Sequence, residues 1–132
     1  MKYEKLFQKG KIGKLELPNR VVMTAMGTMM GDWNGCSTPE QVRFYEERAK
    51  GGCGLIIPEF TRVDPESGQC NRIQLGIFDA RQIRSMEEIC DAVHRHGSKI
   101  FIQLQHGGRA ANSAASGQAV LVVSSIPGVT SY

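Results

Sequence analysis

The sequence contains no long hydrophobic run and no concentration of charge. No stretch approaches the about 20 consecutive apolar residues of a transmembrane helix, and the N-terminal MKYEKLFQKGKIGK lacks the apolar core and cleavage site of a secretory signal. The 16 Lys and Arg residues and 13 Asp and Glu residues leave a net charge of +3, spread along the chain. Proteins that bind nucleic acid or membrane surfaces usually carry a basic patch. We therefore expect neither partner, and we expect a cytoplasmic protein.

Close cysteine pairs and phosphate-binding motifs are also missing. No C-x-x-C motif occurs among the four cysteines, Cys36, Cys53, Cys70 and Cys90. Zinc and iron–sulfur sites usually contain such pairs, so the sequence predicts no metal site, and reduced thiols are the expected state. No G-x-x-x-x-G-K-[ST] motif is present, and no G-x-G-x-x-G opens a helix, which excludes a P-loop and a Rossmann site.

What the sequence does contain is three short apolar segments that each become small or polar at their C-terminal end. They are Arg20–Met26, Gly54–Phe60 and Lys99–Arg109, the last reading KIFIQLQHGGR. Runs of β-branched and aromatic residues without a helical stripe predict strands. Ligands of parallel α/β proteins bind beyond the carboxyl ends of the strands. These segment ends therefore predict a binding site.

Two helices are predicted between these strands. Thr38, Pro39 and Gln41 form a helix start, with Thr38 as cap, proline in the first turn and Gln41 completing a capping box. Asp79 and Gln82 begin the second helix in the same way. Glycines end the two helices at Gly51–Gly52 and Gly97. Their apolar faces are predicted to contain Val42, Tyr45 and Ala49, and Ile83, Met86, Ile89, Cys90 and Val93.

The order of these elements predicts a parallel sheet that is only partly covered. A hairpin over Lys11–Leu17, turning at Gly13–Lys14 with glycine suited to a type II′ turn, precedes the strands. The loop Thr61–Phe78 is long enough to predict a functional role. Right-handed crossovers between parallel strands follow from the alternation of strand and helix. Parallel sheets are buried on both faces, so either other chains complete this sheet or the chain is part of a longer α/β barrel. We favour the second.

Six segments, in order, resemble those of one family. They are LF…KIGKLELPNRVVM, TAMG, FYEERAKGG, GLIIPE, LGIFD and GSKIFIQLQHGGR. The chain resembles the FMN-dependent Old Yellow Enzyme-like NADH:flavin oxidoreductases, which include the 2,4-dienoyl-CoA reductases. The resemblance runs through nearly the whole sequence.

The resemblance implies a fold and a reaction. The fold is a (β/α)8 TIM barrel with FMN at the carboxyl ends of the strands. Such barrels need about 250 residues, so residues 1–132 would be the N-terminal part, with the first three strands and an N-terminal β-hairpin at the barrel floor. The implied reaction passes a hydride from NADH or NADPH through FMN to the activated C=C bond of a small-molecule substrate, as in an ene-reductase. The family's acid, substrate-anchoring pair and phosphate ligands come from later strands, so no catalytic residue is assigned here. Residues 1–132 alone are expected to bind FMN poorly and to be inactive.

The resemblance also implies site residues. It assigns FMN contacts to Thr24, Ala25, Met26, Gly27, Phe60 and Gln103, and substrate contacts to Met29 and His106. An amide suits the polar edge of a flavin because it donates and accepts at once. Thr24 could instead be an ordinary strand residue, and Met26 could pack in the core. A core role for Gln103 is harder to explain, because a buried amide without partners costs about 1–3 kcal/mol.

Departures from the family pattern occur at three of these positions. Many members carry Thr or Cys where this chain has Gly27, and a small residue where it has Phe60. Some carry an aromatic substrate contact where Met29 stands. The resemblance therefore assigns no single substrate class. Glu59, next to Phe60, is expected to orient neighbouring backbone or to pair with Arg62.

Three alternatives remain open from the sequence. The chain could be a non-catalytic truncated fragment that folds or forms a homo-oligomer without binding flavin. It could be a small module that binds a phosphorylated metabolite through Gly107-Gly108-Arg109. His106 and Arg109 could also be solvated, or paired with the protein's own loops, without a role in a site.

Overall fold

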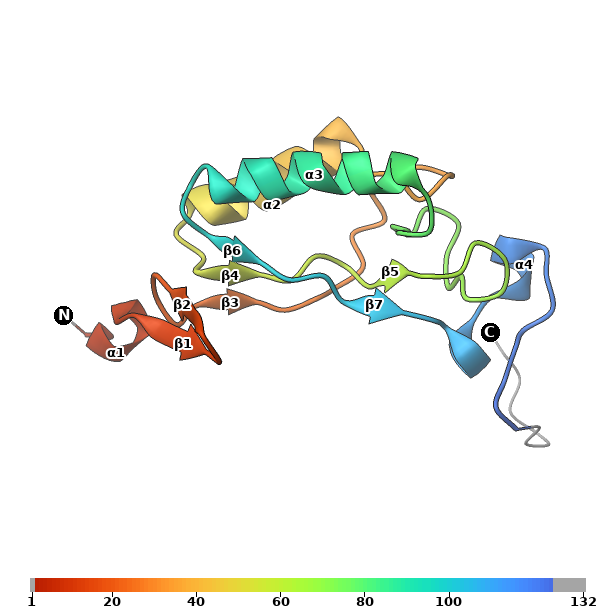
Figure 1. The fold of residues 1–132 in the computed structure, drawn as a ribbon, viewed down its shortest axis with the longest axis horizontal. Helices are drawn as coiled ribbons and strands as arrows, with labels where there is room; N and C mark the ends of the chain where they lie inside the picture. The colour runs from red at the N-terminus through yellow and green to blue at the C-terminus, as the bar shows by residue number, and fades with distance from the viewer. Residues whose placement is uncertain (1, 125–132) are drawn as a thin grey trace.

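Parallel pairing of three short strands forms the centre of the fold. The computed structural model describes residues 2–124. Strands β3 (Val22–Met23), β4 (Leu55–Ile56) and β6 (Lys99–Ile100) pair in the order β3-β4-β6, and both pairings are parallel. Their arrows point the same way in Figure 1. The predicted parallel sheet is confirmed.

A second parallel pair lies beyond the first and corrects two predictions. Strand β5 (Thr61–Arg62) pairs with β7 (Leu104–Gln105). The segment Lys99–Arg109, predicted to begin as one strand, is therefore divided into β6 and β7, and the predicted loop Thr61–Phe78 begins with a strand. The division has its cause in the neighbouring segment between β4 and β5. Pro58 has no N–H to donate, and the Glu59 N–H is donated to the Tyr45 hydroxyl at 2.9 Å instead of to a neighbouring strand.

The N-terminal hairpin forms as predicted. Strands β1 (Gly10–Ile12) and β2 (Leu15–Leu17) are antiparallel, with Ile12 opposite Leu15. Gly13, at the turn, has φ of +55°. Among the described residues, Met29 is the one residue other than glycine that has a positive φ. Positive φ at the first turn position alone is the type II′ pattern. A one-turn helix, α1 (Glu4–Phe7), precedes the hairpin, and both lie at the end of the molecule opposite the strand tips (Figure 1).

Two helices cover one face of the sheet (Figure 1). Helix α2 (Pro39–Lys50) is capped by Thr38, whose Oγ1 accepts from the Gln41 N–H at 3.2 Å. The predicted capping box at this end is wrong, because the Gln41 side chain is buried and its Nε2 donates to Thr28 Oγ1 at 3.0 Å. Helix α3 (Ala80–His94) does have the capping box predicted from Asp79 and Gln82.

The core lies between these helices and the sheet. It is formed by Tyr45, Ala49, Ile56, Leu75, Met86, Ile89 and Val93. The predicted apolar faces of both helices are thus confirmed except at Ile83, which is 50% exposed. Ile83 lies in the first turn of α3.

The other face of the sheet carries no helix in the described residues. Apolar side chains remain exposed in and after its strands: Val21, Val22, Phe101, Ile102 and Leu104. After β7 follow only short helices, η1 (Gly108–Ala110) and α4 (Ser113–Ser116). The predicted lack of cover on one face is confirmed. Within residues 2–124, no helix has the length and apolarity needed to cross a bilayer.

Candidate flavin site at the strand tips

The residues predicted to contact FMN gather at the carboxyl ends of neighbouring strands. Gly27 follows β3, and a Cβ placed on it would lie 3.6 Å from Phe60 Cε1. The next residue along, Thr61, donates its N–H to the Gln103 carbonyl oxygen at 2.8 Å. The tips of three chain segments are therefore in contact in the order Gly27, Phe60, Gln103. This is the arrangement that the parallel sheet was expected to produce.

Their side chains are accessible. Thr24, Met26 and Gln103 are exposed, and Ala25 and Phe60 are half-buried. Met26 is 56% exposed, so packing in the core does not explain it. The Gln103 side-chain amide has no hydrogen-bond partner among the described residues and faces solvent, so both its donor and its acceptor are available to a ligand.

The buried side chain of Glu59 holds the segments at this edge of the sheet together through hydrogen bonds. It is 2% exposed, and its Oε2 accepts from both the N–H and the Oγ1 of Thr28 at 2.6 Å. Its Oε1 accepts from the Leu75 N–H at 3.3 Å. Glu59 thus orients neighbouring backbone, which confirms the first of the two expectations for this residue. The second expectation, that Glu59 pairs with Arg62, is wrong.

Arg62 instead binds its own loop. Its Nη1 donates to Gln69 Oε1 at 2.8 Å and to the Pro65 carbonyl at 3.2 Å, and its guanidinium lies 5.0 Å from the Phe78 ring centroid. Burial lowers the pKa of Arg62, with Asp64 opposing that shift. These contacts order the start of the predicted functional loop.

Tyr45 supports Glu59 from helix α2. Its ring is fully buried, and its hydroxyl accepts from the Glu59 N–H at 2.9 Å. Burial is the main cause that raises the pKa of Tyr45 to about 12. A buried hydroxyl of that acidity is a structural hydrogen-bond partner and a poor proton source at neutral pH.

His106 is held by the protein's own loops. Its Nδ1 accepts from the Gly108 N–H at 3.0 Å, while its Nε2 lies 3.1 Å from Ser67 Oγ and 3.5 Å from Asp64 Oδ2. Ser67 Oγ also donates to Asp64 Oδ2. The side-chain hydrogen bond from Ser67 is the main cause that lowers the pKa of Asp64 to about 2. Because serine and aspartate share one ring nitrogen, this cluster is not arranged as a nucleophilic triad.

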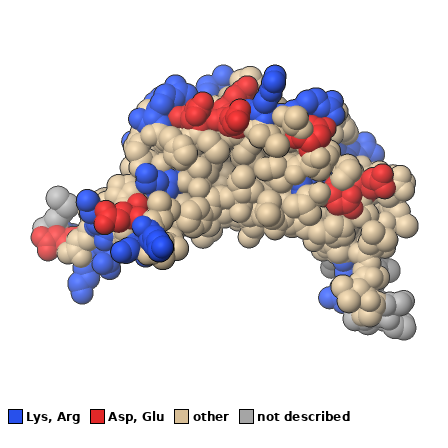
Figure 2. Space-filling model, in the orientation of Figure 1, with Lys and Arg blue, Asp and Glu red and all other residues tan. Residues whose placement is uncertain are grey.

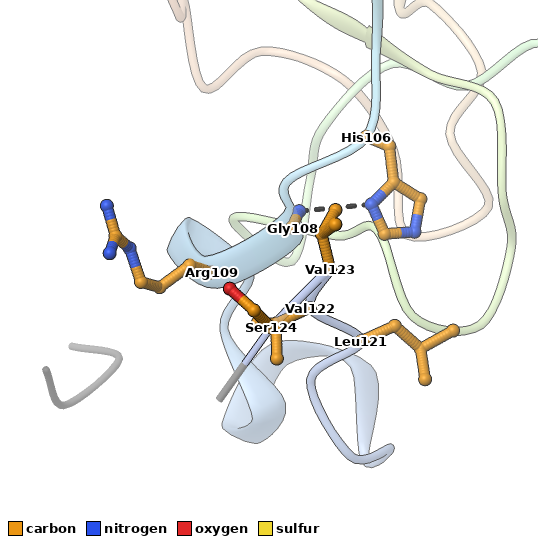
Figure 3. Close-up of a pocket in the computed structure, with 7 residues that line it drawn as sticks. All are labelled: His106, Gly108, Arg109, Leu121, Val122, Val123 and Ser124. Atoms are coloured by element: carbon orange, nitrogen blue, oxygen red, sulfur yellow. Dashed lines mark hydrogen bonds between the residues drawn. The ribbon is translucent and has the colours of Figure 1, made fainter. Parts of the chain in front are cut away.

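The space beside His106 is a cavity of about 560 Å³. Figure 3 shows His106, Gly108 and Arg109 on one side and the segment 121–124 on the other, with the Arg109 guanidinium directed away from the imidazole. His106 and Arg109 therefore do not converge on one ligand position. His106 therefore pairs with loops of its own chain, which was one of the alternatives left open by the sequence.

Met29 lies in a different part of the surface. Its φ is +58°, and it lines a cleft of about 400 Å³ together with Trp33 and Arg72. Neither Met29 nor His106 belongs to the row of contacts from Gly27 to Gln103. The structure thus brings the predicted flavin residues together and leaves the two predicted substrate residues apart from them.

A polar network behind Gln103 was not predicted. Gln74 Nε2 donates to Gln105 Oε1 at 2.8 Å, Gln105 Nε2 donates to Cys70 Sγ at 3.1 Å, and Gln74 Oε1 accepts from the Cys70 N–H at 2.8 Å. The only sequence signal was the polar character of Gln105 at a strand end. No group of three or more His, Cys, Asp or Glu residues among those described could hold a metal ion.

Residues 5–129 match the profile of the NADH:flavin oxidoreductase / NADH oxidase family. The chain belongs to this family. Its members are FMN-dependent oxidoreductases with a nicotinamide hydride donor. The predicted family is confirmed.

Relatives in this family are much longer than the chain. It is 38% identical over 107 residues to the NADH oxidase of Thermoanaerobacter brockii, covering 81% of the chain and 16% of that protein. It is 41% identical over 110 residues to the N,N-dimethylglycine/sarcosine dehydrogenase of Chromohalobacter salexigens, covering 83% of the chain and 16% of that protein. The chain therefore spans about a sixth of the length of these relatives.

The solved structures that resemble the chain establish its place in the flavin oxidoreductase fold. The old yellow enzyme from Trypanosoma cruzi superimposes with a TM-score of 0.82 and 30% identity, covering 96% of the chain and 36% of that enzyme. The fold is thus the N-terminal portion of a (β/α)8 TIM barrel, as predicted.

The residues at the strand tips fit a flavin. A flat ring with one polar edge needs close backbone approach along one face and an amide at the edge. The segment 24–27 contributes exposed backbone with small side chains at Ala25 and Gly27, and Gln103 contributes an amide without other partners.

Proposed function

We propose that this chain is the N-terminal part of an FMN-dependent oxidoreductase that reduces an activated C=C bond of a small-molecule substrate, using NADH or NADPH. The observation that carries the proposal is the continuous row of contacts from Gly27 through Phe60 to Gln103, which ends in an unpartnered amide. FMN, when bound, supplies the hydride-transfer chemistry. Residues 1–132 form one unit of that barrel.

The roles of the chain's own residues follow from their positions. Gln103 is the hydrogen-bonding group for the polar edge of the flavin, and the segment 24–27 lies along its ring. Phe60 lies next to Gly27 and limits the space beside it. Glu59 and Thr28 hold the segment 24–27 in place through their hydrogen bonds at 2.6 Å.

One observation favours a second function, that of a fragment that folds and self-associates without flavin. The sheet face away from α2 and α3 exposes apolar side chains, and the described residues contain no element that covers it. Exposed sheet surfaces and edges promote association between copies. In either case we place the protein in the cytoplasm, where its four free thiols stay reduced.

The two functions differ in whether the barrel that contains this chain retains flavin. Residues 1–132, and the same chain extended through later strands of the barrel, are each mixed with FMN and separated from excess FMN by gel filtration, and their visible absorption spectra are recorded. Because the phosphate ligands implied by the resemblance lie in later strands, the proposal expects retained flavin bands in the extended protein and little FMN on residues 1–132 alone. In the extended protein, Gln103→Ala is expected to weaken FMN binding by about five- to thirtyfold, since a hydrogen-bonded amide edge contributes about 1–2 kcal/mol. Gln118→Ala, at an exposed glutamine, is the matched control. An extended protein that stays colourless would favour the fragment without flavin.

A further inference from the structure

A second cleft lies at the same end of the molecule as the strand tips. Its walls come from the segment after β3, the loop between β5 and α3, and the segment after η1. Three side chains define it: Met29, Trp33 and Arg72. The cavity measures about 400 Å³, within the usual range of small-molecule sites.

The indole of Trp33 offers an open stacking surface. It is 67% exposed, although large aromatic side chains are usually mostly buried. The guanidinium of Arg72 lies 5.8 Å from the ring centroid, over the same indole. Flat heteroaromatic bases stack on aromatic rings and on guanidinium planes, regardless of which base is present.

The charge of the cleft is that of an anion site. Arg72 forms no ion pair with any described carboxylate, and its one hydrogen bond, from Nη2 to the Ala114 carbonyl, is long at 3.5 Å. No acidic residue lines the cleft. Asn71 and Asn112 also line the cleft. The side-chain oxygen of each accepts a hydrogen bond from nearby backbone, whereas the side-chain nitrogen of each donates none among the described residues.

Met29 completes the floor under strain. It adopts φ of +58°, which side-chain-bearing residues rarely adopt. Such conformations concentrate where a loop is held for ligand contact. An aromatic surface, a cation without a carboxylate and two free amide donors thus surround one cavity.

We infer that this cleft binds the adenosine diphosphate part of a ligand, with adenine on Trp33 and the phosphates at Arg72, Asn71 and Asn112. Two ligand classes of the proposed function end in this group: the nicotinamide dinucleotide donor and an acyl-coenzyme A substrate. The choice between these sources rests on the proposed function. The binding itself involves none of the residues assigned to flavin.

The single tryptophan of the chain makes the inference directly measurable. ADP-ribose is titrated into the flavin-free chain while Trp33 fluorescence is followed. We expect saturable quenching, with affinity reduced at least about tenfold by Arg72→Ala because a charge-assisted contact to phosphate is lost. Arg84→Ala removes the same charge from the exposed side of α3 and is expected to leave the affinity unchanged.

Two further titrations test the phosphate and the adenine contacts separately. Adenosine, which lacks phosphate, is expected to bind more weakly, and Arg72→Ala is expected to lower its affinity by much less than that of ADP-ribose. Trp33→Phe, followed by calorimetry with circular dichroism as a check of folding, is expected to weaken ADP-ribose binding. Absence of saturation with ADP-ribose, or equal loss in Arg72→Ala and Arg84→Ala, would overturn the inference.

A final comparison identifies the source of the nucleotide. Tighter binding of ADP-ribose than of 3′-phosphoadenosine 5′-diphosphate supports a dinucleotide, and the reverse supports coenzyme A. Both results support the site. Because no flavin is present, failure of FMN binding leaves this outcome unaffected.

Discussion

At the scale of single residues, Glu59 connects more parts of the molecule than its neighbours do. It joins the segment after β3, the end of the loop 61–78 and, through its N–H, helix α2. Glu59 is 2% exposed, so water cannot replace its carboxylate, and a donor that loses this acceptor stays without a hydrogen bond. The position of the segment 24–27, which we propose lies along the flavin, therefore depends on one carboxylate.

We expect Glu59→Gln to lower the free energy of unfolding by about 1–3 kcal/mol, because an amide NH2 cannot accept from both the N–H and the Oγ1 of Thr28. Urea unfolding followed by circular dichroism measures the change. Glu88→Gln, at an exposed position of α3, makes the same chemical change and is expected to shift stability by less than about 0.5 kcal/mol. Equal effects of the two substitutions would contradict this role.

Asp64 makes stability depend on acid pH. The Ser67 hydrogen bond lowers its pKa from 3.8 to about 2 in the folded chain. Since the folded pKa is depressed, the stabilisation is present above the ordinary value and is lost as pH falls from 3.8 to about 2. We expect Ser67→Ala to raise the Asp64 pKa and to flatten the loss of stability in that window.

Carboxyl-carbon NMR titration of Asp64, together with unfolding free energies across the same pH range, measures both effects. Ser116→Ala, at a serine without contact to a carboxylate, serves as the control. An Asp64 pKa unchanged by Ser67→Ala would show that the backbone N–H donors of Glu66 and Ser67 alone determine it.

At the scale of elements, the start of α3 is set by a local motif. Asp79 Oδ1 accepts from the Arg81 N–H at 2.8 Å, and Gln82 Oε1 accepts from the Asp79 N–H at 2.9 Å. We expect Asp79→Ala to lower the free energy of unfolding by about 1 kcal/mol, with Asp79→Asn nearly neutral because asparagine caps equally well. The exposed ion pair of Asp79 with Arg81 adds little. Urea denaturation distinguishes them, and an equal loss in both variants would assign the effect to charge.

Features of the fold that depend on neighbouring residues were predictable from the sequence. The caps, the glycine helix ends and the hairpin turn at Gly13 all lie within a few residues of the elements they define. Features that depend on distant partners were not predictable. The third strand is divided because the Tyr45 hydroxyl accepts from the Glu59 N–H. The capping box is missing because the Gln41 side chain donates to Thr28 instead.

The candidate site follows the same division. Its location at the strand tips came from the apolar-to-polar change along Lys99–Arg109, and the identity of Gln103 came from the family resemblance. The separation of Met29 and His106 from that row could not be read from spacing. His106 is placed by contacts with Ser67 and Gly108, and Met29 by its left-handed backbone.

At the scale of the whole molecule, charge and apolar surface are unevenly distributed. Figure 2 shows acidic and basic side chains gathered over the two long helices and at the two ends, with a mostly uncharged middle. Strands β3 and β6 are the outer strands of the central sheet, and each has an unpaired edge within the described residues. The chain therefore offers both an edge and an apolar face for association.

We expect the isolated chain to self-associate as its concentration rises, and Ile102→Lys to shift it toward the monomer. Ile102 is 37% exposed just after β6, an outer strand of the central sheet, and lysine at a sheet edge opposes pairing. Sedimentation velocity at several concentrations measures the shift. Val123→Lys, in the exposed tail, carries the same charge and is the control. A wild-type chain that stays monomeric would contradict the expectation.

The contact between Gly27 and Phe60 sets which side chains these two positions can hold together. A Cβ on Gly27 would lie 3.6 Å from Phe60 Cε1, an ordinary van der Waals distance, so alanine at this position would fit without movement of the ring. A longer side chain directed at the ring would require Phe60 to move. The two positions are therefore coupled, and a larger residue at position 27 is expected to be tolerated best together with a smaller one at position 60.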